Sequence, residues 1–419
     1  MSDLNEKYNT AGNIGEVVNK YSARMNESKA GHYDAIPEGD TLRRETTAIL
    51  LDNTEKLKES VNTTAGMETW QPLLMGIARR MAPRLISYDI MGVQAMNAPS
   101  TIMFAMTAKL ANDPLKDQND PTLPETMGLN EVGAGYSGDG VANSGSTFAP
   151  AEPIRGTGKT TYEGETEAWN ALGVSISKTQ VTAVTRNLRA DVSQELKEDM
   201  QHLHGLNAQT EIANYLSNEI LAELNREALG KVYRAAKMGV QWKATGKGIL
   251  DLASDADGRW SVEKFKGLHF AIERDANSVA IESRRGKANK LIVSADIASA
   301  LVAAGILDFA PALQMQSNLS VDPSGATFAG RMGRYDVYVD PYAIGDGYCL
   351  GYKGVNKWDA GIFYCPYIPL QMSRAVNSNS FQDAIGFRTR YAFAANPFTT
   401  LNANQNVYYR KAQVTNLFG

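Results

Sequence analysis

A long polar segment in the middle of the chain, residues 111–165, restricts the possible folds more than any other feature of the sequence. Glycine, proline, asparagine, aspartate, serine and threonine dominate this segment, and it has no sustained apolar period. Compact domains rarely contain so long a loop without secondary structure of its own. We therefore predict that it serves a function outside the body of the protein, or that it becomes ordered only against a partner.

Strand-like sequence flanks this segment on both sides. Residues 100–106 follow Pro99 and predict a buried strand that leads into the segment. Residues 172–186 alternate in polarity and are rich in β-branched side chains, which predicts a strand that returns from it. Residues 70–78, before the first strand, have helical spacing of their apolar side chains.

The strongest helical pattern lies between residues 188 and 238. It predicts one helix from about Ala190 to His204, an interruption at Gly205, and a second helix from Asn207 to Ala236. At about 1.5 Å per residue the second helix would extend about 45 Å. A helix of that length is expected to act as a mechanical spine.

The two ends of the chain differ in composition. Residues 1–68 are polar, with short helices predicted near 14–26 and 41–61, and this segment cannot bury enough area to fold alone. We expect it to be an arm that packs on something else. Beyond residue 260 the pattern becomes α/β and then strand-like. The predicted elements there are helices near 261–278 and 295–305, strands at 290–294 and 335–342, and strand-like sequence at 347–370 and in the tail.

Composition excludes several classes of protein. The 419 residues include 42 Lys and Arg against 46 Asp and Glu, a net charge of −4, which argues against a dedicated nucleic-acid binder. The length suggests two to three domains of roughly 150 residues. Two cysteines, Cys349 and Cys365, cannot form a disulfide framework and fit a reducing compartment. Because no apolar run reaches about 18 residues and the N-terminus is polar, we predict neither a membrane span nor a secretory signal.

The motif GTGKTT at residues 156–161 is the strongest indication of an enzyme. A phosphate-binding loop would need glycine at position 153, where Pro153 stands, with an apolar strand before it and a helix after it. We see neither of these elements in the sequence, so a flexible basic loop is the favoured interpretation.

The sequence predicts no metal site, no cofactor and no catalysis. His202 and His204 are two residues apart, whereas zinc ligands on a helix stand three or four apart. Neither cysteine has a neighbour at ligand spacing, and no serine-hydrolase or zinc-protease motif is present. Two basic clusters, at residues 79–84 and 284–287, serve either solubility or ion pairing across a subunit boundary, where arginine offers bidentate geometry.

Three long stretches of the sequence, together more than a quarter of the chain, strongly resemble the major capsid protein of T-even-type tailed bacteriophages. They stand in the order found in that family, and long aperiodic strings rarely match by chance. The stretches are MAPRLISYDIMGVQAMNAPSTIMFAMTAKL, DVSQELKEDMQHLHGLNAQTEIANYLSNEILAELNRE and GYKGVNKWDAGIFYCPYIPLQMSRAVNSNSFQDAIGFRTRYAFAANPF.

The resemblance implies an α+β, HK97-like phage capsid fold with an N-terminal arm, an extended β-hairpin loop, a peripheral domain with a long spine helix, and an axial α/β domain. A large domain inserted in the extended loop of some relatives is expected to be reduced or absent. The implied division is an arm at 1–68 (1–38 a cleavable propeptide), the first segment of the peripheral domain at 69–110, the extended loop at 111–187, the spine helix and adjoining segment at 188–270, the axial domain at 271–384, and a return to the peripheral domain at 385–419.

The resemblance also implies trimming by a prohead protease after glutamate. Ile36-Pro37-Glu38 followed by Gly39 fits the family pattern and lies in the arm. Leu123-Pro124-Glu125 fits as well, but it lies in the extended loop, where cutting would damage the lattice.

The implied function is structural. The chain would assemble with itself into hexamers, with pentamers as a further form, and build the icosahedral head around double-stranded DNA without sequence-specific binding. Expected partners are vertex, portal, scaffold and decoration proteins and the prohead protease, with no membrane involved. Its location would be the capsid shell of a virion assembled in the host cytoplasm.

Two alternatives stay open from the sequence: a pentameric vertex protein of the same family, and a nucleotide-binding enzyme that uses the degenerate Gly-Lys-Thr loop. The candidate intersubunit contacts, all charged or aromatic, are Arg79, Arg80 and Arg84 near the arm, Lys159, Tyr162, Glu163 and Glu165 in the extended loop, and Glu195, Glu198 and Asp199 on the spine.

Overall fold

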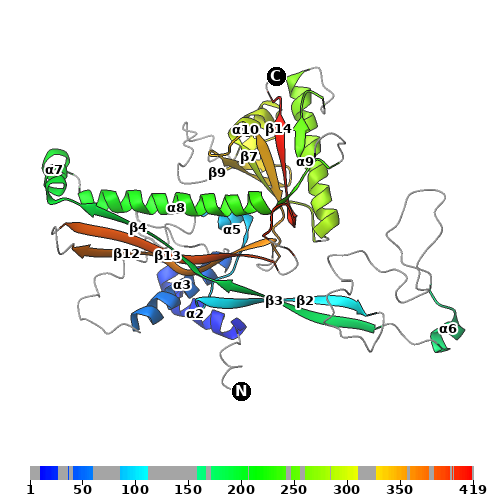
Figure 1. The fold of residues 1–419 in the computed structure, drawn as a ribbon, viewed down its shortest axis with the longest axis horizontal. Coiled ribbons are helices and arrows are strands. Elements are labelled where there is room, and N and C mark those ends of the chain that lie inside the picture. Colours follow the sequence, from blue (N-terminus) through cyan, green and yellow to red (C-terminus); the bar gives the residue numbers. More distant parts are fainter. Residues whose placement is uncertain are drawn as a thin grey trace.

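Two β-sheets and one long helix form the body of the protein in the computed structural model, and a β-hairpin projects from that body (Figure 1). The structure describes residues 10–26, 36, 41–59, 85–111, 158–166, 171–205, 207–241, 247–254, 260–283, 285–309, 327–355, 359–376, 382–396, 399 and 401–417.

The first sheet has four strands in the order β1-β12-β13-β4, and helix α8 (Ala208–Ala235) runs along it (Figure 1). Buried α8 side chains such as Ile220 and Leu224 pack with Phe387 and Tyr391 of the sheet. The predicted spine helix is thereby confirmed. The strands are β1 (Gly92–Val93), β12 (Ile362–Val376), β13 (Asp383–Ala395) and β4 (Val184–Val192).

A polar contact also fixes β4 to α8. Arg186 of β4 forms ion pairs with Glu223 and with Glu227, the latter at 2.6 Å. The Tyr391 hydroxyl donates to Glu227 and accepts from Arg186 Nε at 2.9 Å. The two glutamates stand four residues apart, so they lie on one face of the helix.

The second sheet has eight strands, in the order β5-β14-β11-β7-β10-β9-β8, with β6 beside β14. Helices α9 (Ser261–Ser283) and α10 (Ala295–Ala303) pack on it, which confirms the α/β pattern predicted beyond residue 260. Its strands are β5 (Ala236–Met238), β6 (Ile249–Asp251), β7 (Lys290–Ser294), β8 (Asp308–Phe309), β9 (Thr327–Met332), β10 (Tyr335–Asp340), β11 (Gly347–Gly351) and β14 (Asn406–Thr415).

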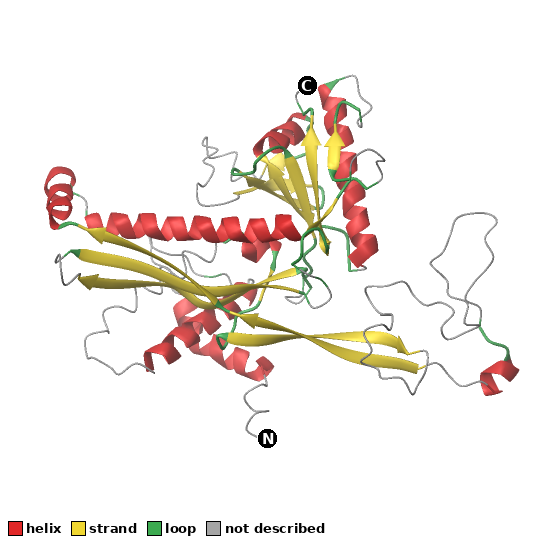
Figure 2. Ribbon diagram, in the orientation of Figure 1, coloured by secondary structure: helices red, strands yellow, loops and turns green. Residues whose placement is uncertain are grey.

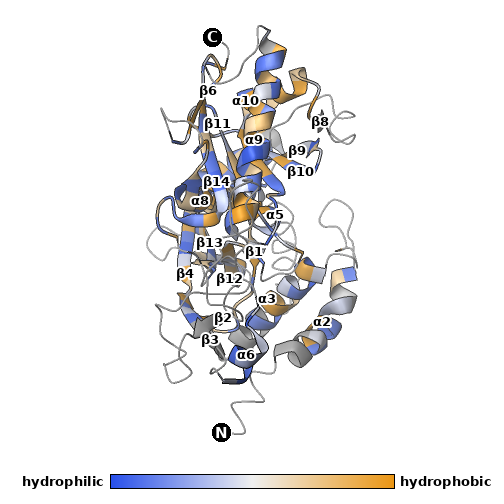
Figure 3. Cartoon of the chain, turned by 90° about the vertical axis from the view of Figure 1, so that its right-hand side faces the viewer, coloured by the Kyte–Doolittle hydropathy of each residue, from blue (hydrophilic) through white to orange (hydrophobic). Residues whose placement is uncertain are grey.

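Alternation along β7 places this sheet between two hydrophobic cores. Leu291 and Val293 pack with α9 and α10, whereas Ile292 joins the core around α8. Side chains of a strand point to opposite faces in turn, so both faces of this sheet are buried. Figure 3 shows hydrophilic and hydrophobic residues alternating along α9, as expected for a helix with one face in a core.

The projecting hairpin pairs β2 (Ser100–Ala111) with β3 (Ala171–Thr182) from Ser100↔Thr182 to Ala111↔Ala171 (Figure 2). Both strands flanking the polar segment are therefore confirmed, although β3 ends at Thr182. The expectation that the first strand is buried is only half right. Met103 is 2% exposed but Ile102 is 47% exposed, because a two-stranded ribbon can bury only one of its faces against the body. Residues 112–157 lie outside the described part of the chain.

The helix predicted from Ala190 begins later than expected. Residues 184–192 form β4, which pairs antiparallel with β13 from Val184↔Tyr391 to Val192↔Asp383. Helix α7 (Gln194–His204) follows. Leu188 and Ala190 both pack on the α8 core, a spacing of two that suits a strand, so pairing with β13 overrides local helical preference.

The C-terminal boundary also differs from the expectation. A division at residues 384 and 385 falls inside β13. β12 already belongs to the first sheet, whereas β14 lies in the second sheet between β11 and β5. Residues 385–419 therefore divide between the two sheets, because the β14 residues from Tyr409 to Gln413 pair with β11.

The arm helices pack on each other and on the body. Helices α2 (Thr10–Asn26) and α3 (Thr41–Glu59), which match the two predicted arm helices, share an apolar contact that includes Met25 and Ala48. Asn53 Nδ2 donates to Met96 O at 2.8 Å and to Tyr367 O at 3.0 Å, which ties α3 to the first sheet. The predicted helical turns at 70–78 lie outside the described residues. None of the helices within the described ranges is long and apolar enough to cross a bilayer.

Candidate assembly interface

Helix α6 (Thr161–Thr166) lies beyond the hairpin and carries most of the candidate contacts of the extended loop (Figure 1). Thr160 N and Oγ1 donate to Glu163 Oε2 at 3.0 and 2.8 Å, and Glu163 N donates back to Thr160 Oγ1 at 3.4 Å. This reciprocal arrangement is a capping box. The backbone and hydroxyl donors of Thr160, aided by Lys159, lower the pKa of Glu163.

The surface of α6 faces away from the described body. None of its residues is buried, and Tyr162 is 76% exposed. Glu165 is also exposed and Lys159 is half-buried. The expectation that no helix follows GTGKTT is wrong, because α6 starts at Thr161, although it has only six residues and Pro153 precedes the described part. The local Thr160 cap, formed within the chain, compensates for the few contacts that α6 makes.

Helix α7 carries the candidate acids of the spine region. Glu195, Glu198 and Asp199 are all exposed on it. Ser193 Oγ caps its first turn by accepting from Leu196 N at 3.3 Å, and Gly205 ends it with φ of +65°. Serine at an N-cap and glycine in the left-handed region are the preferred residues at helix ends.

An ion pair holds α7 against the first sheet. Lys197 Nζ lies 3.2 Å from Asp383 Oδ2, and Gln209 Nε2 of α8 donates to the same oxygen. Lys197 lowers the pKa of Asp383, and Gln209 lowers it further. The orientation of α7 is thus fixed by capping and by this bridge between α7, α8 and β13.

The predicted contact residues form two separate surfaces. Figure 1 places α6 and α7 at opposite ends of the molecule, so the loop and spine candidates do not meet within one chain. Of the second basic cluster, Lys287 forms an ion pair with Glu273 of its own chain. Arg79, Arg80, Arg84, Glu38 and Gly39, together with the second cleavage motif at Glu125, lie outside the described residues.

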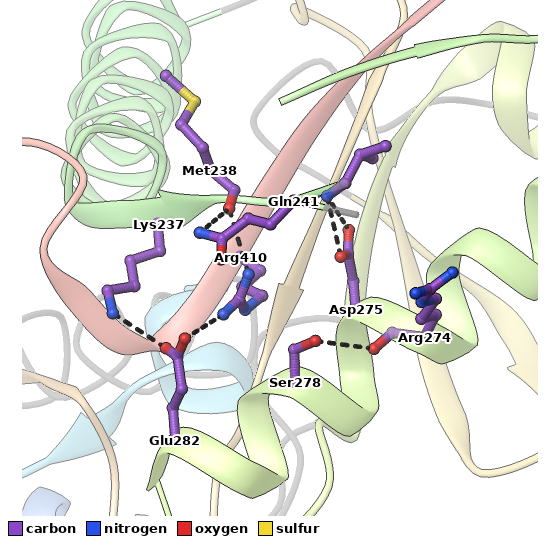
Figure 4. Close-up of polar contacts among 9 residues, drawn as sticks. Lys237, Met238, Gln241, Arg274, Asp275, Ser278, Glu282 and Arg410 are labelled. Carbon is purple, nitrogen blue, oxygen red and sulfur yellow. Dashed lines mark hydrogen bonds and ion pairs between the residues drawn. The ribbon is translucent and has the colours of Figure 1, made fainter. Parts of the chain in front are cut away.

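Sequence reasoning missed the polar junction where α8 leads into the second sheet (Figure 4). Arg410 of β14 has a side chain only 2% exposed; it pairs with Glu282 of α9 and donates to Met238 O at 3.3 Å. Lys237 also pairs with Glu282, at 3.1 Å. A buried guanidinium needs such partners, since an unpaired buried charge is strongly destabilising.

Asp275 completes this junction. Its carboxylate accepts from Val240 N at 3.0 Å and from the Tyr348 hydroxyl at 2.7 Å. Burial raises the pKa of Asp275. A Cβ on Gly239 would lie 2.2 Å from Asp275 Oδ2, so any larger residue there would displace the Asp275 carboxylate. One feature of the sequence could have identified Asp275: it is an acid on the apolar stripe of α9, between Ile272 and Val279.

An ionic contact also joins α8 to β10 of the second sheet. The Asp340 side chain, 1% exposed, accepts from Arg226 Nη1 at 3.1 Å and from the Tyr233 hydroxyl at 2.9 Å. Arg226 also lies over the Tyr342 ring. Helix α8 is therefore attached to both sheets by buried or half-buried ionic contacts.

The two cysteine thiols have low reactivity. Cys349 and Cys365 are buried, and burial raises the pKa of each to about 12. A thiol with so high a pKa is a poor nucleophile at neutral pH. Across the part of the chain that the structure describes, no cluster of three or more His, Cys, Asp or Glu residues is arranged to hold a metal ion.

Arm helices, a projecting hairpin, a long helix against a four-stranded sheet and a separate α/β sheet together make up the α+β, HK97-like architecture that the resemblance implied. The class is that of a phage capsid protein. The family described as "Major capsid protein Gp23" matches residues 67–414, and the chain belongs to that family.

Individual relatives agree with this assignment. The major capsid protein of Salmonella phage ViI is 38% identical over 392 residues, covering 86% of this chain and 87% of the relative. The major capsid protein of Enterobacteria phage T4 is 31% identical over 395 residues, covering 78% and 75%. The capsid vertex protein of the same phage is 26% identical over 240 residues, covering 54% and 53%.

Solved structures with a similar fold include the capsid of Myoviridae phage XM1. It has a TM-score of 0.41 and 10% sequence identity, covering 79% of this chain and 92% of that one. On the strength of its family, the chain is a structural protein of a phage capsid shell, and building a shell requires that it associate with itself.

Proposed function

We propose that this chain forms the main lattice of an icosahedral head, as hexamers and also pentamers, around packaged double-stranded DNA. The observation that carries the proposal is the exposure of α6 and α7, two helices at opposite ends of the molecule that bury little against the described body (Figure 1). Ordering a segment costs conformational entropy, which contacts with a neighbouring subunit would offset. A closed symmetric shell supplies the same neighbour to every copy.

The two sheets supply the proposed domains. The first sheet with α8 is assigned to the peripheral domain, and the second sheet with α9, α10 and β14 to the axial domain at the centre of a capsomer. Residues 1–68 are the proposed arm, and the segment between 111 and 187 is the proposed extended loop. Support for this division comes from the separate hydrophobic core that the second sheet forms with α9 and α10.

The candidate contacts are proposed as surfaces between subunits. Tyr162 and Glu165 on α6 would meet one neighbour, together with Lys159 and Glu163. Glu195, Glu198 and Asp199 on α7 would meet another. Arg79, Arg80 and Arg84 are proposed as ion-pair donors near the arm. The exposure of the α6 and α7 residues supports these roles.

Processing and other partners follow from the same proposal. A prohead protease would cut between Glu38 and Gly39, in the stretch between α2 and α3. Vertex, portal, scaffold and decoration proteins would complete a virion assembled in the host cytoplasm. The net charge of −4 suits a wall that encloses DNA without binding it tightly, since tight binding needs a basic surface.

The vertex role is the second candidate. Its support is the partial similarity to the T4 capsid vertex protein, 26% over 54% of this chain. The T4 major capsid protein is 31% identical over 78% of this chain, which favours the main lattice.

The test is assembly of the purified full-length chain, followed by size-exclusion chromatography and negative-stain imaging. We expect sheets, tubes or shells with hexameric repeats. Exclusively pentameric assemblies would favour the vertex role. A stable monomer that binds ATP in a saturable manner, and loses that binding on Lys159→Ala, would support the enzyme alternative instead.

A further inference from the structure

Helix α7 exposes an apolar stripe that its own chain does not cover. Leu196 is 44% exposed, Leu203 is 76% exposed, and Met200 between them is half-buried. These three residues stand at positions i, i+4 and i+7, so they lie on one side of the helix. An uncovered stripe of this spacing is typical of a helix that docks on a partner.

Two of the three acids of α7 lie next to this stripe. With about 100° between successive residues, Asp199 and Glu195 fall beside the leucines, whereas Glu198 falls on the side of the helix opposite the stripe. Across the described residues, no ion pair reaches any of the three carboxylates. Lys197 lies on the side of the helix opposite Glu195 and Asp199, where it pairs with Asp383. The surface that α7 presents outward is therefore both apolar and acidic.

An arginine row on the first sheet has the complementary charge. Leu188, Phe387 and Tyr391 pack toward the α8 core, so the alternate residues Arg189, Arg388 and Arg390 face the other side of the sheet. Arg189 lies opposite Gly386, which places it diagonal to Arg388, with about 7 Å between such positions. Arg390 follows Arg388 by two residues on the same strand.

The arginine row has few partners of its own. Arg189 is 69% exposed and pairs only locally, with Asp191 at 3.0 Å. Arg388 is exposed, and its guanidinium forms no hydrogen bond or ion pair with another described residue. Arg390 stacks on the Tyr367 ring at 5.3 Å, and its buried Nε has no acceptor among the described residues. A row of guanidiniums with so few acceptors fits the carboxylates of a partner.

We propose that the outward surface of α7 (Glu195, Leu196, Asp199, Leu203) docks on the arginine row (Arg189, Arg388, Arg390) of a second copy of this chain. The inference rests on the proposed shell function and names the partner surface for two of the α7 acids. Charge complementarity selects a copy of the same chain as the occupant, because the carboxylates of Glu195 and Asp199 on one surface meet the guanidiniums of the arginine row on the other.

The proposed contact is compatible with two-fold symmetry. β4 carries Arg189 and leads directly into α7, so the two surfaces lie on adjoining elements (Figure 1). Two copies related by a two-fold axis then form the contact twice, each offering α7 and receiving that of the partner.

Charge reversal with rescue tests the proposal on the full-length chain. Because like charges repel across an interface, Asp199→Arg and Arg388→Glu should each lower particle yield by about tenfold, measured by sedimentation and negative-stain counting. The combined variant should recover most of that yield, since the pair is restored with inverted sign. Gln201→Arg, which adds a positive charge on the far side of α7, is the matched control and should leave the yield unchanged.

Disulfide trapping gives a second measurement that does not depend on charge reversal. Chains with Asp199→Cys and chains with Arg388→Cys are mixed, assembled and oxidised, and cross-linked heterodimers are expected in excess of either homodimer. Absence of the heterodimer in assembled particles, or full assembly of both reversal variants, would overturn the docking proposal. If the unmodified chain forms no particles at all, the proposed shell function fails instead.

Discussion

Helices α7 and α8 follow each other in the chain, yet they are stabilised in opposite ways. Helix α8 buries an apolar stripe between two sheets and is joined to them by Arg186, Arg226 and Tyr233. Helix α7 leaves its leucines exposed and depends on a serine cap, a glycine end and one ion pair. We infer from this difference that α8 stabilises the subunit itself, whereas α7 is available for contact with another subunit.

We expect the largest difference in unfolding free energy when one leucine in each helix is replaced by alanine. Leu224→Ala in α8 removes a fully buried side chain and should lower the free energy of unfolding by about 3 kcal/mol, measured by denaturant titration. Leu203→Ala in α7 should change it by less than about 0.5 kcal/mol, because its side chain is exposed. Equal losses in the two variants would remove the distinction between the helices.

Asp275 tests the junction at the end of α8. Asp275→Ala leaves Val240 N and the Tyr348 hydroxyl without an acceptor and should cost about 2 kcal/mol of unfolding free energy. Asp275→Asn keeps an acceptor for both donors and should cost less. A larger loss for asparagine than for alanine would contradict this account of the junction.

The pH dependence of the same residue has a definite sign. Because burial raises the pKa of Asp275, the folded protein binds this proton more readily than the unfolded chain. The contribution of this group to stability therefore increases as the pH falls from neutral toward the ordinary aspartate value of about 3.9. Subtracting the pH profile of Asp275→Asn from that of the unmodified chain isolates this increase, and a difference of opposite sign would refute it.

Capping of α7 should have a smaller and more local effect. Ser193→Ala removes the acceptor for Leu196 N and should cost about 1 kcal/mol of helix stability. Hydrogen exchange should accelerate at the α7 amides, while the α8 amides from Leu216 onward keep their protection. Equal acceleration in both helices would mean that α7 and α8 unfold as one unit.

The smallest effect is expected at the exposed ion pair of α7. Lys197, then Gln209, lowers the pKa of Asp383, so the contribution of this pair is present above the ordinary aspartate pKa and is lost as the pH falls through the lowered one. This sign is opposite to that of Asp275. Exchange at the α7 amides should quicken in that acidic range, and Lys197→Met should abolish the pH dependence without changing α8.

Local pattern was sufficient for the long helix and for most of the second sheet. The predicted span from Asn207 to Ala236 corresponds to α8, because Asn207 caps the first turn and the apolar residues keep a helical period. The strand at 290–294 and the helix that follows it were equally clear. Where a segment carries its own period and its own end signals, sequence is enough.

Prediction from local pattern failed where strands pair between segments that are distant in the sequence. We predicted a helix from about Ala190, but pairing of β4 with β13, almost two hundred positions later, makes residues 190–192 part of a strand. β14 joins the second sheet for the same reason, through its register with β11. The same holds for the two sides of the candidate interface. The α7 acids could be identified from the sequence. The arginine row could not, because it depends on the strand register that brings Arg189 next to Arg388.

By itself, the sequence determined the helix periods, the two strands that flank the polar segment and the capsid family. Only the tertiary structure decided which charges are buried and which remain available to a partner. Arg410 and Asp275 are the same residue types as Arg388 and Asp199, but their surroundings in the fold bury the first two and leave the second two exposed. The physical reason is that desolvation and charge pairing depend on neighbours in space, which strand register and packing set and local sequence does not.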